Sequence, residues 1–192
     1  MVGNQKHAEV ADARTIARSV DEPQAFAALF ERHFSVVCRF LSLRAGEHSA
    51  ADLAAETFVI AFRRRADYDL TRADARPWLL GIAANLAHEQ RRNERRRQDA
   101  LFRLERERTM NSQDDAPAAM GAGPSSENLR AALAELPPEE CDLLLLFGCV
   151  GMSYSEIGEA LSLPVGTVRS RIHRLRHKLR GRLSLPAEEV GA

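Results

Sequence analysis

Residues that build disulfide frameworks and strands are scarce in this chain. It has three cysteines, Cys38, Cys141 and Cys149, an odd number without a CxxC pair, which argues against a disulfide framework. Aromatic residues make up 6% of the sequence, and runs of Val, Ile and Thr typical of strands are absent. Ala, Leu, Arg and Glu dominate instead, so the composition predicts an all-α fold. No stretch approaches the length of a membrane span, and we expect a cytoplasmic protein without a membrane partner.

Patterns that support catalysis are also missing. The sequence has no glycine-rich phosphate loop, no cluster of metal ligands and no nucleophile spaced with a base, which leaves little basis for an enzyme. His173 and His177 have a spacing that could place two imidazoles on one metal ion, but no third ligand is evident nearby. We therefore expect neither a cofactor nor a metal.

The net charge is zero, but the charges are unevenly distributed along the chain. Residues 63–97 carry ten basic and five acidic side chains, and residues 164–192 carry seven and two, whereas residues 98–163 carry four and twelve. Of the 27 basic residues only Lys6 and Lys178 are lysines, and arginine suits phosphate and guanine contacts, although a codon bias toward arginine explains the excess equally well. The two basic blocks predict two surfaces that face nucleic acid, in a chain whose neutral overall field binds free DNA weakly.

The apolar pattern divides the chain into two helical domains. Apolar residues every three or four positions predict helices over 21–46, over 49–65 and from 76 past 97, the first capped by Asp21 and the second by Ser49. Small residues, Pro and Gly without periodicity indicate a flexible linker before the second domain. The predicted organisation is an N-terminal extension (1–22), a helical bundle (23–98), a linker (99–126), a second helical domain (127–185) and a C-terminal tail (186–192).

The last third of the chain contains a helix-turn-helix pattern. Ser153, with Glu156 three residues later, predicts a capping box on one helix, and a second helix begins after Pro164. On a helical wheel, the buried side of this second helix consists of Val168, Ile172, Leu175 and Leu179. Its outward side presents Arg169, Ser170, His173, Arg174 and His177. A solvated face usually mixes charges of both signs, and this one has no carboxylate, which favours entry into a DNA major groove. The hydroxyls of Tyr154 and Thr167 are expected to hold phosphates.

The third predicted helix of the bundle has a second polar face. Its apolar side is expected to consist of Leu79, Ile82, Ala83 and Leu86, and its opposite side of Gly81, Asn85, His88, Arg92 and Arg95, with Trp78 at the border. Asparagine is a poor helix former, which indicates a specific hydrogen-bonding role for Asn85. Together with the arginines of residues 91–97, this face suits unstacked bases and a phosphate backbone, as in single-strand recognition. For Trp78 alone, a place in the core is the simpler interpretation.

These motifs, in this order, resemble the sigma factors of bacterial RNA polymerase, in the small extracytoplasmic-function (ECF) group of the sigma-70 family. Residues 24–46 resemble region 2.1 and residues 50–58 resemble region 2.2. Residues 78–97 resemble regions 2.3 and 2.4, and residues 136–180 resemble region 4 almost throughout. Two separate motifs in the right order make the resemblance specific, whereas region 4 alone would also fit many response-regulator output domains.

The resemblance implies roles for particular residues. The clamp helices of core polymerase would be contacted by Asp52, Leu53, Glu56 and Phe58. Asn85 would read a base flipped from the −10 element, and the melted strand would lie beside Trp78, His88, Arg91, Arg92, Arg95 and Arg96. The major groove of the −35 element would be entered by Arg169, Ser170, Arg171, His173 and Arg174. The implied partners are the clamp helices and flap of the large polymerase subunits, promoter DNA and an anti-sigma factor.

The chain departs from the family pattern at a few positions. Ala51 and Ala55 stand at two of the places where the family usually has acids before the region 2.2 leucine and a glutamine after it, which bears on the strength of clamp docking. Ser162 replaces a common glycine in the turn before Pro164, so we expect a strained backbone there. His173 lies where the family varies, which leaves the −35 base preference open.

A stand-alone helix-turn-helix regulator is the alternative from another class of protein. Such a regulator would dimerise and bind a duplex site tightly by itself. A sigma factor would instead bind free DNA weakly and direct specific transcription only together with core polymerase.

Overall fold

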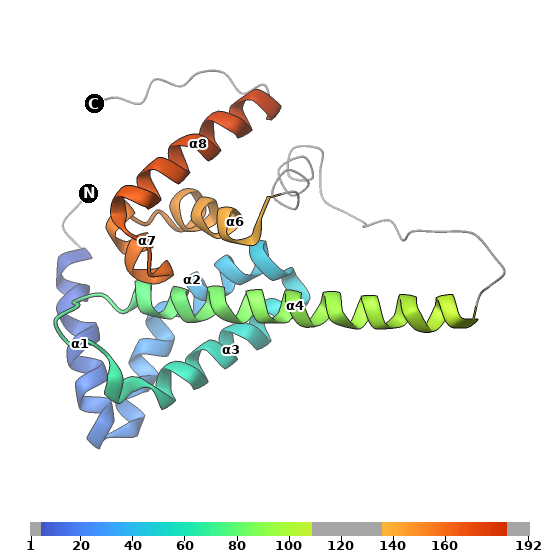
Figure 1. The fold of residues 1–192 in the computed structure, drawn as a ribbon. Helices are drawn as coiled ribbons and strands as arrows, with labels where there is room; N and C mark the ends of the chain where they lie inside the picture. The colour runs from blue at the N-terminus through green and yellow to red at the C-terminus, as the bar shows by residue number, and fades with distance from the viewer. Residues whose placement is uncertain (1–4, 109–135, 184–192) are drawn as a thin grey trace.

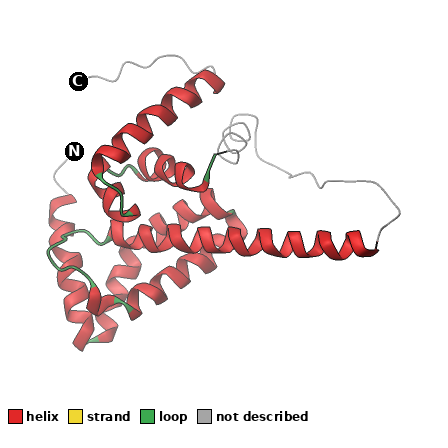
Figure 2. Cartoon of the chain, viewed as in Figure 1, coloured by secondary structure: helices red, strands yellow, loops and turns green. Residues whose placement is uncertain are grey.

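The computed structural model describes residues 5–108 and 136–183, and every regular element in these two ranges is a helix or a helical turn (Figure 1, Figure 2). The predicted all-α fold is therefore confirmed. The first range contains α1 (Gln5–Asp21), the 3-10 turn η1 (Pro23–Phe26), α2 (Ala27–Ala45), α3 (Glu47–Arg63), the 3-10 turn η2 (Arg65–Asp67) and α4 (Arg76–Arg108). The second contains α6 (Pro138–Leu145), the π-helical turn η3 (Leu146–Val150), α7 (Tyr154–Leu161) and α8 (Val165–Leu183). Among these helices, none is both long and apolar enough to cross a bilayer.

Helices α2, α3 and α4 form the centre of the first domain. Each contributes fully buried apolar side chains, such as Leu29, Ala54 and Leu79. Gly46 joins α2 to α3 with a φ of 90°, a conformation that favours glycine, and its N–H donates to the carbonyl of Ser42 at 3.1 Å. Because α3 starts directly after this glycine, the predicted cap at Ser49 is wrong.

The N-terminal segment belongs to the first domain instead of standing apart as an extension. Helix α1 packs on α2 and on the turns η1 and η2. Ile16 is fully buried, and the Arg65 Nε donates to the carbonyl of Ser19 at 3.0 Å. Asp21 is the last residue of α1, so the prediction that it caps the next helix is wrong, and η1 leads into α2.

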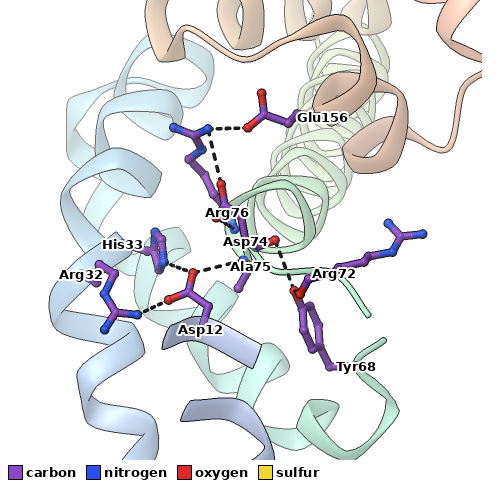
Figure 3. A network of polar contacts seen from close by, with 9 residues as sticks. All are labelled: Asp12, Arg32, His33, Tyr68, Arg72, Asp74, Ala75, Arg76 and Glu156. Atoms are coloured by element: carbon purple, nitrogen blue, oxygen red, sulfur yellow. Dashed lines mark hydrogen bonds and ion pairs between the residues drawn. The ribbon is translucent and has the colours of Figure 1, made fainter. Parts of the chain in front are cut away.

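A buried carboxylate connects α1 to the rest of the domain (Figure 3). Asp12 is 2% exposed, and its Oδ2 lies 2.7 Å from the Nε2 of His33 and accepts the backbone N–H of Ala75 at 3.1 Å. The guanidinium of Arg32 donates to its other oxygen. Burial alone would raise the pKa of Asp12, but the hydrogen bond and charge of His33, the Ala75 amide and Arg32 outweigh burial and lower it. Asp12 therefore holds α1, α2 and the start of α4 together.

In the part of the second domain that the structure describes, α6, α7 and α8 pack together. Of the four residues predicted on the buried side of α8, Val168, Ile172 and Leu175 are buried and Leu179 is half-buried. The predicted capping box of α7 is confirmed, because the Glu156 N–H donates to the Ser153 Oγ at 3.3 Å and the Ser153 N–H donates to the Glu156 Oε2 at 2.7 Å.

The two domains pack against each other and share one apolar core (Figure 1). Helix α7 lies on α4, and α6 lies on α2. Gly81 of α4 is buried under α7, where a Cβ on this residue would lie 2.4 Å from the carbonyl oxygen of Ala160. The prediction that Gly81 lies on an outward face is therefore wrong. The predicted linker also starts too early, because α4 continues to Arg108; the rest of that linker and the C-terminal tail lie outside the described residues.

We expect Asp12→Asn to lower the free energy of unfolding by about 2 kcal/mol at neutral pH, because Arg32 and His33 lose the charge they share. Since folding lowers the pKa of Asp12 from 3.8, the stabilisation is present above that pH and is lost as the pH falls through the lowered pKa. Urea unfolding at neutral pH and below pH 3.8 measures both effects.

Asp21→Asn is the matched control, because it removes the same charge at an exposed position on the same helix. It should change the free energy of unfolding by less than about 0.5 kcal/mol. Equal stability of Asp12→Asn and the native chain at neutral pH would contradict the role assigned to this carboxylate.

Candidate nucleic-acid interface

Helix α8 presents a basic outward surface. Arg169, His173 and Arg174 are exposed, as are Ser170 and His177, in agreement with the helical wheel. Two other predicted DNA residues, Thr167 and Arg171, are half-buried. Arg171 lies toward α6, where its Nη1 is 3.8 Å from the Glu139 carboxylate. The exposed side of α8 therefore combines hydrogen-bond donors with positive charge, which suits base edges and phosphates.

An aromatic pair supports this surface from beneath. The rings of Tyr154 and Phe147 stack with their centroids 5.4 Å apart. The guanidinium of Arg169 lies 5.9 Å from the Tyr154 ring centroid, and that of Arg176 lies 5.8 Å from the Phe147 ring centroid. Neither Phe147 nor Arg176 stands out in the sequence, because residues in separate elements share no periodicity. Cation–π contacts at this pair help to orient α8 relative to α7 and to the turn η3.

The turn between α7 and α8 is tight. Ser162 has a φ of 55° and a ψ of 43°, so the predicted strain is confirmed. Gly158 lies so close to the next segment that a Cβ on it would meet the Leu163 carbonyl oxygen at 2.7 Å. The Leu163 N–H closes the turn by donating to the Gly158 carbonyl at 2.9 Å. This close approach sets the angle at which α8 leaves α7.

A second polar surface runs along α4 as a groove of about 550 Å³. Six of the predicted single-strand residues line it, namely Asn85, His88, Arg91, Arg92, Arg95 and Arg96. Asn85 is exposed, as are three of the four arginines. Partial burial and the neighbouring guanidinium groups of Arg44 and Arg95 lower the pKa of Arg91, although an arginine stays charged at neutral pH. The groove therefore combines one amide with four arginines, whose positive charge exceeds that of the two acids, Glu89 and Asp99, that also line it.

Two of the predicted residues of this surface, Trp78 and the groove residue His88, are held by the protein itself. Trp78 is half-buried and packs on Tyr68 with ring centroids 4.9 Å apart. The Tyr68 hydroxyl donates to the carbonyls of Arg72 and Asp74, and burial raises its pKa. His88 lies with its Nε2 2.5 Å from an Asp142 carboxylate oxygen in the second domain.

The four predicted polymerase residues divide into two pairs. Asp52 and Glu56 are exposed on α3, whereas Leu53 and Phe58 are buried. The Phe58 ring packs against Phe30 at 4.9 Å between centroids, and Phe30 is 39% exposed. Phe30 belongs to the apolar periodicity of residues 21–46, and the structure leaves its ring partly at the surface.

One cluster has the composition of a metal site. Ligand atoms of Asp12, His33 and Asp74 lie within 4.8 Å of one another. However, both oxygens of Asp12 already accept hydrogen bonds, and the Arg32 guanidinium supplies the positive charge beside them. This donor set is therefore an ion-pair network of the fold, and we assign no metal to it.

Two sigma-70 family models match this chain. Residues 29–97 match sigma-70 region 2, and residues 126–179 match sigma-70 region 4. The chain is 34% identical to RNA polymerase sigma factor CarQ of Myxococcus xanthus over 81% of this chain and 87% of CarQ. This chain belongs to the ECF group of the sigma-70 family. It is therefore an RNA polymerase sigma factor.

Other relatives agree with this assignment. The chain is 38% identical to the ECF sigma factor SigE of Mycolicibacterium smegmatis over 77% of its own length, and spans 57% of SigE. The ECF sigma factor SigW of Bacillus subtilis is 32% identical over 71% of this chain and 76% of SigW. Among solved structures, CnrH in complex with the cytosolic domain of CnrY superposes with a TM-score of 0.66 at 25% identity, over 92% of this chain and 99% of CnrH.

In this sigma factor, the groove along α4 belongs to region 2 and the helix α8 belongs to region 4.

We expect Ser162→Gly to raise the free energy of unfolding by about 0.5–1 kcal/mol, because glycine adopts a positive φ without strain. Ser155→Gly, inside α7 with a helical backbone, is the matched control and should lower it by a similar amount. Urea unfolding of both variants checks this prediction, and a loss of stability in Ser162→Gly would contradict it.

Proposed function

We propose that this sigma factor binds core RNA polymerase and directs it to promoters by holding DNA at two differently shaped surfaces. The observation that carries the proposal is the pairing of an exposed basic helix, α8, with a separate arginine-lined groove along α4. A projecting helix fits the major groove of a duplex, whereas a groove with an amide and arginines fits a strand whose bases are unstacked.

Region 4 would recognise the −35 element. Arg169 and Arg174 carry guanidinium groups that can donate two hydrogen bonds to a guanine edge, worth about 1–3 kcal/mol of discrimination each. Ser170, His173 and His177 would add contacts to bases or phosphates, and Tyr154 and Thr167 would fix the register. Arg171 would support α8 from the side of α6, through its ion pair with Glu139.

Region 2 would stabilise the separated strands at the −10 element. Asn85 would hydrogen-bond a flipped base in the groove, and Arg92, Arg95 and Arg96 would hold the phosphates beside it. Capture of an extruded base offsets an unstacking cost of a few kcal/mol, so binding itself favours the open promoter. The sigma factor would make and break no covalent bond in this process.

The exposed carboxylates Asp52 and Glu56 would contact the clamp helices of core polymerase, and the partly exposed ring of Phe30 adds an apolar anchor nearby. Buried Leu53 and Phe58 would support this surface from inside. Family membership also implies an anti-sigma partner, and CnrH, which this chain resembles, was solved with a domain of another protein. Membership of the sigma-70 family does not favour the alternative of a stand-alone regulator.

We expect Arg174→Ala to weaken promoter binding by the polymerase holoenzyme about tenfold, because one base contact of about 1–3 kcal/mol is lost. Binding to core polymerase should not change, because Arg174 is on α8 in region 4, whereas Asp52 and Glu56 are on α3 in region 2. Arg14→Ala, which removes an exposed arginine of α1, is the control and should leave promoter affinity intact. Fluorescence anisotropy on a cognate promoter fragment measures the effect, and unchanged affinity for Arg174→Ala would contradict the outward face.

We expect Asn85→Ala to reduce open-complex formation about tenfold while closed-complex formation stays nearly unchanged, because only the separated strand presents a flipped base. Asn93→Ala is a matched control, since Asn93 is an exposed asparagine of the same helix outside the arginine-lined groove. Permanganate reactivity of thymines reports opening, and a competition assay at low temperature reports the closed complex. Equal losses in both assays would speak against base capture by Asn85.

A further inference from the structure

The helix α4 continues beyond the arginine-lined groove and projects from the bundle (Figure 1). Asp99 is the last residue of α4 that lines the groove, whereas the helix extends to Arg108. Residues 95–103 contain four arginines and one acid, and all of these side chains are exposed. The positive charge that suits a phosphate backbone therefore extends past the end of the groove.

An aromatic side chain lies in this extension. Phe102 is 68% exposed, more than any other large apolar side chain that the structure describes, and Leu101 beside it is 58% exposed. Neither belongs to the apolar core or to the side chains that pack against it. Single exposed apolar side chains are common on protein surfaces, so exposure alone assigns no role to either residue. Their positions around the helix distinguish them.

Phe102 shares the side of α4 that carries the groove residues, and Leu101 does not. Residues three, four or seven positions apart lie on one side of a helix. Phe102 follows Asp99 by three positions and Arg95 by seven, and both of these residues line the groove. On a helical wheel Phe102 is about 20° from Arg95, whereas Leu101 is about 120° away. Phe102 therefore continues the row of groove residues by one more turn.

The groove itself offers no large aromatic ring. Among the described residues that line it there is no Phe, Tyr or Trp. Trp78, the aromatic residue predicted for this surface, is half-buried against Tyr68. Surfaces that hold single strands combine positive charge with aromatic rings on which bases stack. Phe102 would supply such a ring at the end of the groove.

The spacing along α4 suits one continuous strand. Phe102 lies about 25 Å beyond Asn85 along the helix axis, at a rise of about 1.5 Å per residue. A stacked strand advances about 3.4 Å per nucleotide, so the two residues would contact bases about seven nucleotides apart, or fewer in an extended strand. One rigid helix can therefore hold both ends of such a segment.

We propose that Phe102 is a base-stacking residue that extends the hold of region 2 on the separated strand beyond the groove. The ring would lie against one unpaired base, and the guanidinium groups of Arg95 and Arg103 would contact phosphates beside it. The contact would tolerate any sequence, because every base has a face on which a ring can stack. That the strand comes from a promoter rests on the proposed function, whereas stacking on a single strand does not.

The test compares Phe102→Leu with Phe102→Tyr in the full-length chain. Leucine keeps an apolar side chain but removes the ring, whereas tyrosine keeps the ring. The probe is a fluorescein-labelled oligothymidine of about twelve nucleotides, which is longer than the span between Asn85 and Phe102. Fluorescence anisotropy should show an affinity about tenfold lower for Phe102→Leu and nearly unchanged for Phe102→Tyr.

The salt dependence of binding separates stacking from charge. Phe102→Leu removes no phosphate contact, so the slope of log affinity against log salt concentration should equal that of the native chain. Arg96→Ala removes an exposed guanidinium of the groove and should reduce that slope by about 0.7.

Leu101→Ala is the matched control, because it removes an exposed apolar side chain from the neighbouring position on another side of the helix. It should bind the oligothymidine as the native chain does. Neither Phe102 nor Leu101 packs against the core, so these variants should leave the midpoint of urea unfolding unchanged.

Several results would overturn the proposal. These are native affinity in Phe102→Leu, an equal loss in Leu101→Ala or in Phe102→Tyr, and a native chain that does not bind the oligothymidine. If Phe102→Leu keeps its affinity for the strand but binds core polymerase less tightly, Phe102 belongs to a protein interface and stacking is refuted. Run-off transcription with core polymerase tests the proposed function separately, because its failure would leave the stacking measured on the free chain intact.

Discussion

The close approach of helices from both domains to the first half of α4 is the constraint on which this structure depends. Small side chains make it possible: Ala83, Ala84 and Ala87 are buried along with Gly81. Larger residues such as Leu79 and Leu80 fill the remaining space between the layers. Because a close-packed interior tolerates little added volume, Gly81 in particular is needed where the Ala160 carbonyl of region 4 approaches α4.

The second half of α4 has the opposite character. From Arg92 to Arg103 every side chain is exposed, so the helix projects beyond the bundle and carries its arginines into solvent (Figure 1). One helix therefore has two functions along its length. Its buried half fixes the orientation of the bundle, and the arginines that follow extend the polar groove away from the core. Rigid support of this kind places charged groups for nucleic acid without the entropy cost of ordering a loop.

Charge is used differently at the surface and in the interior. The exposed arginines on the outward side of α8 have no acidic neighbour on that helix, and those of α4 outnumber the acids beside them, so both sets are available to phosphates. The buried or half-buried ones, Arg32 and Arg44, each meet a carboxylate from a distant part of the sequence. Asp12 and Asp142 thus each fix the relative position of helices that are distant in sequence. Each is nearly inaccessible to water, so each has a large effect on the position of its partners.

Much of the architecture was predictable from residue patterns. The stripe of Val168, Ile172 and Leu175, the capping box of Ser153 and the outward side of α8 all depend on residues within a few positions of one another. Local periodicity and hydrogen bonding encode such features directly. The sequence did not predict that helix α1 packs in the bundle. Its attachment depends on Ile16 and Asp12, which form no apolar stripe on a helical wheel.

By itself, the sequence determined the helical class, the two motifs and the face that α8 turns outward, since these follow from side chains three or four residues apart. Only the tertiary structure decided that Gly81 and His88 face region 4, that Phe58 is buried while Phe30 is partly exposed, and that Arg44 meets Asp142. Residues 44 and 142 are 98 positions apart, and no local pattern links them. Such pairs exist only after two separately encoded surfaces pack together, because burial, which gives them their strength, is a property of the assembled fold.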